Sequence, residues 1–394
     1  MHILFIRNYP TVDGVFTLLL RLAKQFKKDG HTVYFIDFGV ESDLKSEIEG
    51  AFNLLNIGDV KIKKNIPNID ILFPFADGEL LYWCINYLKY ELFKNAKMVM
   101  GVFHPRAYFS STYIGPTPDT RLNKLILENL PSENILFMNE VVKRDHKNYF
   151  KNKFEKSLIV PLPVKLDNKL RDLSKINRKK IVSISRLENF KRYVLPMIDV
   201  IEELHNVGHE FEFYIYGHGQ LEKFIENYIA QKKLGQYVFL MGKLDYEKLY
   251  LVLEDSFMFV GMGTTIIEAS SIGVPSLQAI DNEKRPVTYG FFSNLSGFCV
   301  GEVVPELPLI NMKDSIIELS KQNELEYQEI CRAHIVRTNT FNIDVVIEQY
   351  YSFFSNASNV FKFRISNFNQ ITTKLLRQMF KAKFLSRSQF RFRI

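Results

Sequence analysis

The amino-acid sequence predicts an α/β protein with two doubly wound domains. Strand-like apolar runs alternate with helix-like amphipathic runs along most of the chain, which is typical of parallel sheets built from βαβ units. The length of 394 residues exceeds the usual size of a single domain. The alternation lapses in the polar stretch 164–178, which we interpret as a linker between two halves.

The expected elements follow the chain in order. In the first half, a helix is expected at 15–30, and strands are expected at 2–7, 31–38, 69–76, 97–103, 134–139 and 157–163. In the second half, the expected strands are 179–185, 211–217, 237–242 and 256–261, and the expected helices lie near 193–207, 220–233, 245–254 and 264–272. A further amphipathic helix is expected at 342–357.

Composition narrows the class of protein. Hydrophobic residues make up 46% of the chain and charged residues 24%, which are globular values. The 3 cysteines are widely spaced, fit neither a disulfide framework nor a zinc site, and favour a reducing compartment. No apolar run reaches the roughly 18 residues that span a bilayer, and the N-terminal apolar run is broken too early for a secretory signal. We therefore expect a cytoplasmic protein.

The positive charge is concentrated at the C-terminus. The chain has a net charge of +7, and residues 362–394 carry nine Lys or Arg and no Asp or Glu. The tail 361–394 interleaves these cations with Phe and Leu, which is typical of a segment attracted to an anionic membrane surface. Nucleic acid would attract the same composition, and a flexible solubilising tail is a third interpretation.

The stretch "GMGTTIIEASSIGVPS" (261–276) joins a strand to a helix. Gly263 allows a tight turn or a close approach to a ligand, and Thr264 or Thr265 can cap the helix. The helix N-terminus attracts anions, and Glu268 lies one turn further along the same face. A phosphate beside a diol-bearing sugar would meet both features, but turn chemistry, a cap and a solvated carboxylate explain the stretch equally well.

Three other loops follow strands in the second half. "ISRLENFKR" (184–192) places Arg186 and Lys191 where they could neutralise a diphosphate, although a basic solvated loop explains them as well. "YGHGQLEKF" contains Gly217 and "LMGKL" contains Gly242, and turn chemistry alone accounts for both. Because ligands bind beyond the carboxyl ends of parallel strands, these loops are the candidates for a site.

Two residues of the first half occupy similar positions. Gly14 lies between the first strand and its helix, where a backbone could approach a phosphate. His104 directly follows a strand and could donate, accept or titrate near neutral pH, although a lone histidine is more often structural.

Several catalytic patterns do not occur in the sequence. It contains no Asp-x-Asp, no His-Glu-x-x-His, no P-loop and no Gly-x-Ser-x-Gly. These absences disfavour a carboxylate-bound metal site, a zincin, a P-loop kinase and a serine hydrolase.

Together, "SISRLENFK", "YIYGHGQLEKF", "VFLMGKL" and "GMGTTIIEASSIGVPSL" resemble, in order and separation, the motifs of glycosyltransferase family 4, the glycosyl transferases group 1. The resemblance covers about 179–280 and, more faintly, the N-terminal βα unit and the His104 segment. It implies the GT-B architecture, in which two Rossmann-like domains face each other across a cleft. The domains would be an acceptor domain at 1–163 and a nucleotide-sugar domain at 164–341, with C-terminal helices at about 342–394 packing back on the first.

The resemblance also implies roles for the candidate residues. Arg186 and Lys191 would hold the donor diphosphate, Glu268 the ribose hydroxyls, and His104 would be the active-site histidine near the donor sugar. The remaining donor-binding positions would be Gly14, Gly217, Gly242, Gly263, Thr264 and Thr265. Family members usually transfer with retention of anomeric configuration and without a tightly bound metal, so no metal or cofactor is expected beyond the nucleotide-sugar substrate.

One position departs from the family pattern. The family commonly has a Glu eight positions before the one that matches Glu268, and here that position is Val260. Because that carboxylate usually helps to hold the donor sugar, the departure suggests an altered donor pocket.

The expected function is that of a retaining glycosyltransferase. It would extend a lipid-linked saccharide of a bacterial-type surface polysaccharide (capsule, O-antigen or lipopolysaccharide) at the inner face of the membrane, held there by the tail, and would bind no nucleic acid. A nucleotide-sugar 2-epimerase of the same architecture and a non-catalytic scaffold are the alternatives.

Overall fold

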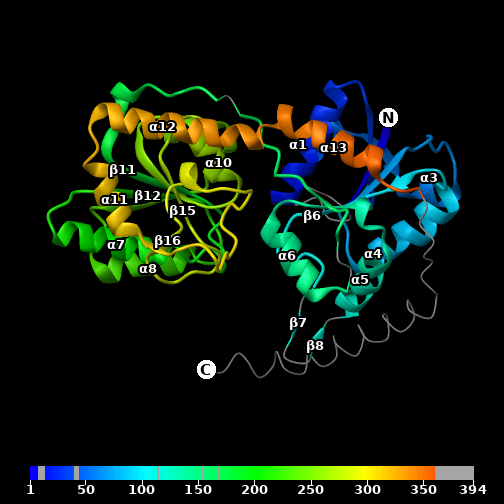
Figure 1. Cartoon of the computed structure of the whole chain (residues 1–394), viewed down its shortest axis with the longest axis horizontal. Coiled ribbons are helices and arrows are strands. Elements are labelled where there is room, and N and C mark those ends of the chain that lie inside the picture. Colours follow the sequence, from blue (N-terminus) through cyan, green and yellow to red (C-terminus); the bar gives the residue numbers. More distant parts are fainter. Residues whose placement is uncertain are drawn as a thin grey trace. The chain divides into compact units, whose positions relative to one another are not determined.

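The structure is a computed structural model that describes residues 1–7, 14–39, 44–109, 111–112, 115–116, 118–151, 154–166 and 168–359. The chain forms two compact units, each with a parallel sheet and flanking helices (Figure 1). Unit 1 contains Met1–Pro163 and the chain from Val346 onward, and unit 2 contains Val164–Val345. The predicted α/β class with doubly wound parallel sheets is therefore confirmed.

The sheet of unit 2 has five parallel strands in the order β13-β12-β11-β14-β15. These strands are β11 (Asn177–Ile184), β12 (Glu212–Tyr216), β13 (Val238–Gly242), β14 (Ser256–Gly261) and β15 (Ser276–Gln278). All six residues of β14 are buried, as expected for a strand covered on both faces. Short strands β16 (Val287–Thr288) and β17 (Ile310–Asn311) form an antiparallel pair outside this sheet.

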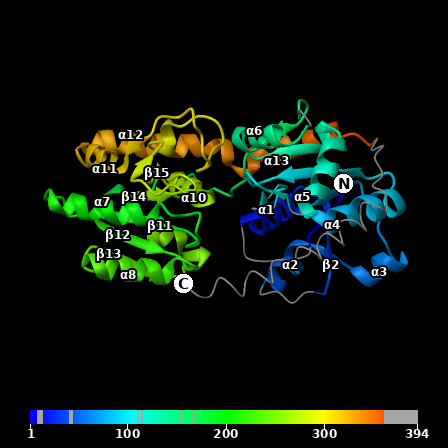
Figure 2. The same cartoon turned by 90° about the horizontal axis from the view of Figure 1, so that it is seen from below.

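Helices lie on both faces of this sheet, as Figures 1 and 2 show for α8 and α12. The helices of unit 2 are α7 (Val194–Asn206), α8 (Glu222–Lys232), α9 (Leu249–Leu253), α10 (Thr264–Ser271), α11 (Met312–Ser320) and α12 (Glu324–Thr338). In α7 the buried residues Val194, Met197, Ile198, Ile201 and Leu204 recur at helical spacing. They form one apolar stripe that packs in the core with β11 and β12.

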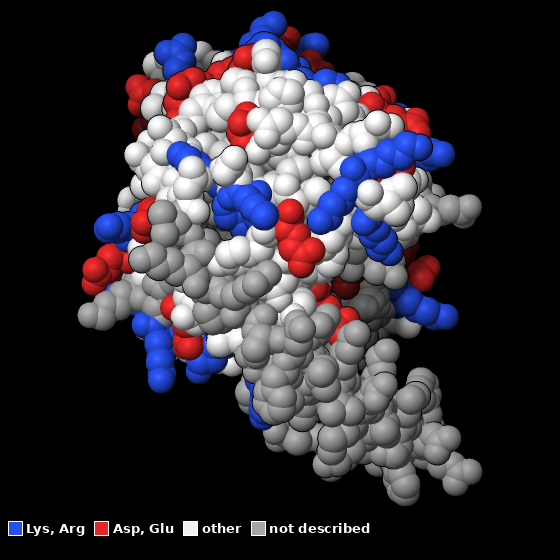
Figure 3. Space-filling view, turned by 90° about the vertical axis from the view of Figure 1, so that its right-hand side faces the viewer, with Lys and Arg blue, Asp and Glu red and all other residues white. Residues whose placement is uncertain are grey.

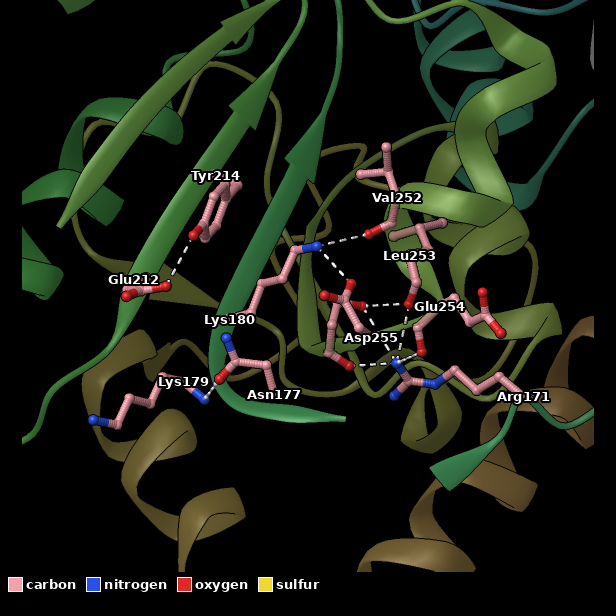
Figure 4. Close-up of polar contacts among 11 residues, drawn as sticks. Arg171, Asn177, Lys179, Lys180, Glu212, Tyr214, Val252, Leu253, Glu254 and Asp255 are labelled. Carbon is pink, nitrogen blue, oxygen red and sulfur yellow. Dashed lines mark hydrogen bonds and ion pairs between the residues drawn. The ribbon is translucent and has the colours of Figure 1, made fainter. Parts of the chain in front are cut away.

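Polar side chains fasten the amino edge of this sheet (Figure 4). Arg171 is buried and donates to the carbonyl oxygens of Leu253 at 3.1 Å and Glu254 at 3.3 Å. Lys180 of β11 bonds the carboxylate of Asp255 at 2.5 Å. Because a buried cation is costly without partners, these contacts anchor the start of unit 2 to the edge of its own sheet.

The strands of unit 1 form two parallel sheets that share one run of chain. The orders are β3-β2-β1-β4-β5 and β10-β9-β6. The strands are β1 (His2–Ile6), β2 (Thr32–Asp37), β3 (Asn53–Asn56), β4 (Ile71–Pro74), β5 (Lys97–Met98), β6 (Met100–Val102), β9 (Ile135–Phe137) and β10 (Leu158–Ile159). Val99 donates to Leu72 at 2.9 Å, so the chain at 97–102 continues from the first sheet into the second.

The helices of unit 1 include the last described helix of the chain. They are α1 (Gly14–Lys28), α2 (Lys45–Ala51), α3 (Ile57–Ile62), α4 (Gly78–Trp83), α5 (Pro118–Asn129), α6 (Glu140–Tyr149) and α13 (Ile343–Asn356), with a π-helix at Cys84–Leu92 and a short hairpin of β7 (Ser111–Thr112) and β8 (Gly115–Pro116).

Aromatic side chains pack α13 onto the N-terminal elements of unit 1. The rings of Tyr350 and Phe354 lie against Phe26 of α1, with centroids 6.4 Å and 5.6 Å away. Lys97 donates to the carbonyl oxygen of Ser355 at 2.7 Å. Residues near both ends of the described chain thus share one core, in which aromatic contacts supply much of the buried area.

Candidate functional site

Four neighbouring strands of unit 2 end at the same edge of the sheet, so the loops that follow them lie together. Backbone hydrogen bonds join these loops in sequence. Ser185 donates to Tyr216 at 3.0 Å, and Gly217 donates to Gly242 at 2.7 Å. The loops after β11, β12 and β13 therefore form one connected rim at the carboxyl edge.

Gly217 is required by a close approach within this rim. It has φ +144°, and a Cβ atom built there would lie 1.8 Å from the carbonyl oxygen of Ser185. Gly219 is similarly close to Leu187, whose backbone N–H donates to His218 at 2.9 Å. Gly217 thus lets the loop that carries Arg186 pack against the loop after β12.

Arg186 and Lys191 lie in the loop between β11 and α7. Arg186 is exposed and Lys191 is half-buried. Neither cationic group makes a hydrogen bond or an ion pair with any residue that the structure describes; Lys191 lies only over the ring of Phe190, 5.9 Å from its centroid. Two cations that form no ion pair at a strand's carboxyl end are suited to bind an anion.

The lowered pKa of Lys191 also reflects a site that favours an anion. Burial and, to a smaller extent, the positive charge of Arg186 lower the pKa of Lys191 to about 8, against the opposing effect of Asp281 and Glu188. Asp281 follows β15, and the adjacent Asn282 donates to the carbonyl oxygen of Phe190 at 2.7 Å. The fold therefore brings Arg186 and Lys191 close enough for their positive charges to repel each other, and a bound anion would relieve this repulsion.

The turn into α10 differs in detail from the sequence prediction. Gly263, with φ 75° and ψ −150°, is the N-cap, and no side chain caps the helix, so the prediction of a threonine cap is wrong. Thr264 is the first helical residue, and the Thr265 hydroxyl donates back to Met262 at 3.2 Å. The turn is so short that only glycine suits the cap conformation, and this displaces the threonines into the helix.

The N-terminus of α10 is open. A Cβ atom at Gly263 would meet nothing within 4 Å. Within the described chain, no group accepts a hydrogen bond from the backbone N–H of Thr264 or Thr265. Orphan N–H groups and the helix dipole make such an end favourable for an anion.

Glu268 is buried, and this contradicts the interpretation of a solvated carboxylate. It is 1% exposed and accepts a hydrogen bond from the Tyr246 hydroxyl at 2.7 Å. Tyr246 begins a 3₁₀ turn (Tyr246–Lys248) that follows β13. Glu268 therefore connects α10 with the loop beyond Gly242.

Val260 lies inside β14, where it pairs with Leu277 of β15 and is fully buried in the core. Only Met262 and Gly263 separate the end of β14 from α10. Val260 therefore belongs to the packed strand and not to the loop.

The candidate residues of unit 1 lie apart from this group in the chain. Gly14 is the exposed first residue of α1. His104 is exposed just after β6, and its Nδ1 accepts the backbone N–H of Arg106 at 3.1 Å, so in the neutral ring the proton is on Nε2. The site roles of Gly14 and His104 stay predictions.

A buried histidine supports the segment after His104. His146 of α6 lies edge-on to the rings of Tyr108 and Phe109, with centroids 6.4 Å and 5.0 Å away. Burial lowers the pKa of His146 to about 4, so it is neutral at physiological pH. It acts as an apolar support for this loop.

The described residues contain neither a metal-type cluster nor a membrane-spanning helix. No group of three or more His, Cys, Asp or Glu there is arranged to hold a metal ion. None of the described helices has the length and apolar composition needed to cross a bilayer.

Solved structures with a similar fold include glycosyltransferases. The chain aligns over 90% of its length with TarM of S. aureus, in a complex with fondaparinux, α-GlcNAc-glycerol and UDP, at a TM-score of 0.63, 15% identity and 99% coverage of that chain. The pneumococcal O-GlcNAc transferase GtfA, in a complex with UDP and GlcNAc, aligns over 90% at a TM-score of 0.59, 11% identity and 98% coverage. The fold is that of the GT-B glycosyltransferases.

Sequence similarity falls on the unit that carries the site. Residues 167–281 match the family model described as Glycosyl transferases group 1. The GtfA subunit of a UDP-N-acetylglucosamine–peptide N-acetylglucosaminyltransferase from Streptococcus agalactiae is 27% identical over 204 residues, which are 45% of this chain. The aligned part spans 38% of that relative's length.

Sequence reasoning missed two residues of this edge. Tyr246 lies four residues beyond Gly242 and Asp281 lies just after β15. The apolar run at 276–280 is a signal for a strand. Asp281 directly follows this run, so its position after a strand makes it a candidate site residue in the same way as Arg186. Nothing in the sequence pairs Tyr246 with Glu268.

Proposed function

We propose that this protein is a glycosyltransferase that takes a sugar from a nucleotide-sugar donor bound at the carboxyl edge of the unit 2 sheet. The observation that carries the proposal is a set of donors at that edge that form no ion pair or hydrogen bond with the described residues, namely the cationic groups of Arg186 and Lys191 and the N–H groups of the first turn of α10. The donor diphosphate would lie against these groups, and Glu268 would bind the ribose hydroxyls. The match of 167–281 to Glycosyl transferases group 1 supports the assignment.

Uridine diphosphate is the nucleotide to test first. The structures of TarM and pneumococcal GtfA that share this fold contain UDP. In the proposed reaction, cleavage of the bond between the anomeric carbon and the diphosphate leaves negative charge on the departing phosphate. Arg186, Lys191 and the α10 amides stabilise that charge, which is the electrostatic part of catalysis. The role that the resemblance implies for His104 stays a prediction.

We further propose that the transfer retains the anomeric configuration and needs no bound metal. The acceptor would be a lipid-linked saccharide of a surface polysaccharide. The tail 361–394, which lies outside the described residues, supports the lipid-linked acceptor by its composition. On the face in Figure 3, Lys and Arg are spread among uncharged surface and do not gather in one patch. We assign the electrostatic anchor to the tail because of its charge and composition, with the protein at the inner face of the membrane.

Calorimetric titration of the full chain with UDP, GDP, ADP and CMP tests the donor site. We expect one nucleoside diphosphate to bind with a dissociation constant in the micromolar range. If none binds, both the transferase and a 2-epimerase are excluded and a scaffold remains. Conversion of the matching nucleotide sugar without an acceptor would indicate the epimerase, and the anomeric coupling in a transfer product would decide between retention and inversion.

Sedimentation with liposomes tests the tail. The full chain should bind vesicles that contain phosphatidylserine and should not bind neutral vesicles. A full-length variant in which the nine Lys and Arg of 362–394 are replaced by Gln should lose this binding. Undiminished binding of the variant would contradict the anchor.

A further inference from the structure

Tyr246 joins two parts of the carboxyl edge that are distant in the chain. Its side chain is 57% exposed, yet its hydroxyl donates at 2.7 Å to a carboxylate that is 1% exposed. The phenol therefore reaches from the surface to the buried Glu268. This contact fixes the position of the loop after β13 relative to α10.

The turn that carries Tyr246 is held in place by its own contacts. Gly242, with φ 73°, ends β13 and accepts a hydrogen bond from Gly217. Lys248 closes the turn, since its backbone N–H donates to Asp245 at 2.9 Å and its ammonium bonds the Asp245 carboxylate at 3.1 Å. The phenol of Tyr246 is thus presented by a defined turn and not by a free loop.

The chemistry of a buried carboxylate gives this contact its importance. A carboxylate has two oxygens that together accept about four hydrogen bonds, and in a buried position it needs donors. Tyr246 occupies Oε1 of Glu268. A phenol on one oxygen orients the carboxylate, and the two hydroxyls of a ribose are donors of the kind that a carboxylate accepts.

We propose that Tyr246 is a positioning residue that determines specificity for the ribose of the donor nucleotide. It holds the Glu268 carboxylate in the orientation in which it accepts hydrogen bonds from the ribose diol. This inference rests on the proposed nucleotide site, because it concerns how that site recognises its ligand. It requires no movement of Tyr246 away from Glu268.

The test compares UDP with 2′-deoxy-UDP and 3′-deoxy-UDP by calorimetry on the full chain and on Tyr246→Phe. The variant keeps the ring and removes only the hydroxyl. We expect it to bind UDP about three- to tenfold more weakly, as for the loss of one ordinary hydrogen bond. We expect the deoxy analogues to lose less affinity, so that the preference for ribose shrinks.

A double-mutant cycle with Glu268→Gln separates positioning from stability. If Tyr246 acts through Glu268, the double variant should bind UDP no more weakly than Glu268→Gln alone. Tyr237→Phe is the matched control, because Tyr237 precedes β13 at the opposite edge of the sheet. It should leave the ribose preference unchanged.

The outcomes separate this inference from the proposed function. If the unaltered chain binds none of the nucleotides, the proposed site fails. If it binds UDP and Tyr246→Phe shows the same ribose preference, with or without a lower unfolding temperature, Tyr246 is only structural and the inference is wrong. Tighter UDP binding by Tyr246→Phe would also overturn it, because the phenol would then compete with the ribose.

Discussion

The two edges of the unit 2 sheet treat their cations differently. At the amino edge, Lys180 is paired with Asp255, and one terminal nitrogen of Arg171 donates to the main-chain carbonyls of Leu253 and Glu254. At the carboxyl edge, Arg186 and Lys191 have no partner among the described residues. The same residue types therefore form partnered contacts at one edge and no ion pair at the other, and on the proposed function it is pairing, more than residue type, that distinguishes a structural cation from a binding one.

The largest effect on nucleotide binding is expected when both cations of the carboxyl edge are removed. The double variant Arg186→Ala/Lys191→Ala should bind the nucleoside diphosphate at least about 100-fold more weakly, since two charge-assisted contacts are lost, and should abolish transfer. Calorimetry and a transfer assay measure both effects. The unfolding temperature should not fall.

Lys180→Met at the amino edge is the matched control for this double variant. It should lower the free energy of unfolding by about 1–2 kcal/mol without changing nucleotide affinity, because it breaks a half-buried ion pair remote from the site. Chemical denaturation measures the loss. An equal loss of nucleotide affinity in both variants would show that the edges do not differ in role.

Glycine substitutions at the carboxyl edge give the next effect. Gly217→Ala places a methyl group against Ser185 and should destabilise unit 2 by about 3 kcal/mol or more, measured by chemical denaturation.

Gly263→Ala meets open space, so its cost is backbone strain of about 1–3 kcal/mol, and its methyl group should in addition weaken nucleotide binding. Unchanged nucleotide affinity in a folded Gly263→Ala variant would contradict a ligand at the α10 N-terminus.

The pH dependence of binding reports on Lys191. Its pKa in the free protein is lowered to about 8, and a bound diphosphate would raise it, so binding takes up a proton above pH 8. Affinity should therefore fall as pH rises from 8 to 9.5, by at most about tenfold per pH unit. Lys191→Arg should remove the dependence, because guanidinium stays protonated. A flat profile for the unaltered chain would contradict contact between Lys191 and the diphosphate.

The stability of the ligand-free protein should change in the opposite direction. The folded pKa of Lys191 lies below its ordinary value, so the unfolded chain binds more protons between those values. The contribution of Lys191 to the free energy of unfolding should therefore rise with pH from about 8 upward. Comparison of the denaturation of the unaltered chain and Lys191→Met across this range measures it.

The smallest effect is expected for an exposed pair at the amino edge. Lys179 and Glu210 form an ion pair with both side chains more than half exposed. Lys179→Ala should leave the free energy of unfolding, measured by chemical denaturation, nearly unchanged, because solvent screens the pair. A larger loss would mean that the amino edge relies on more than its buried contacts.

Local patterns in the sequence predicted most of the fold. The alternation of strands and helices led to the parallel α/β class, and the loops after β11, β12, β13 and β14 were identified as candidates from their place after strands. Elements were missed where the pattern is short, as for β3 and β15, since a few apolar residues do not reveal a period. The N-cap of α10 was assigned to a threonine because threonine is a common cap, whereas the backbone conformation there requires glycine.

The sequence by itself determined the order of the elements and which residue types stand at the ends of strands, because both follow from local periodicity and turn chemistry. Only the tertiary structure decided which of those residues have partners. The burial of Glu268, its contact with Tyr246, the place of Val260 in the core and the lack of partners at Arg186 and Lys191 depend on strands that are distant in the chain and adjacent in the sheet. Which side chains contact each other depends on which strands are adjacent in the sheet, and a local sequence pattern does not contain that information.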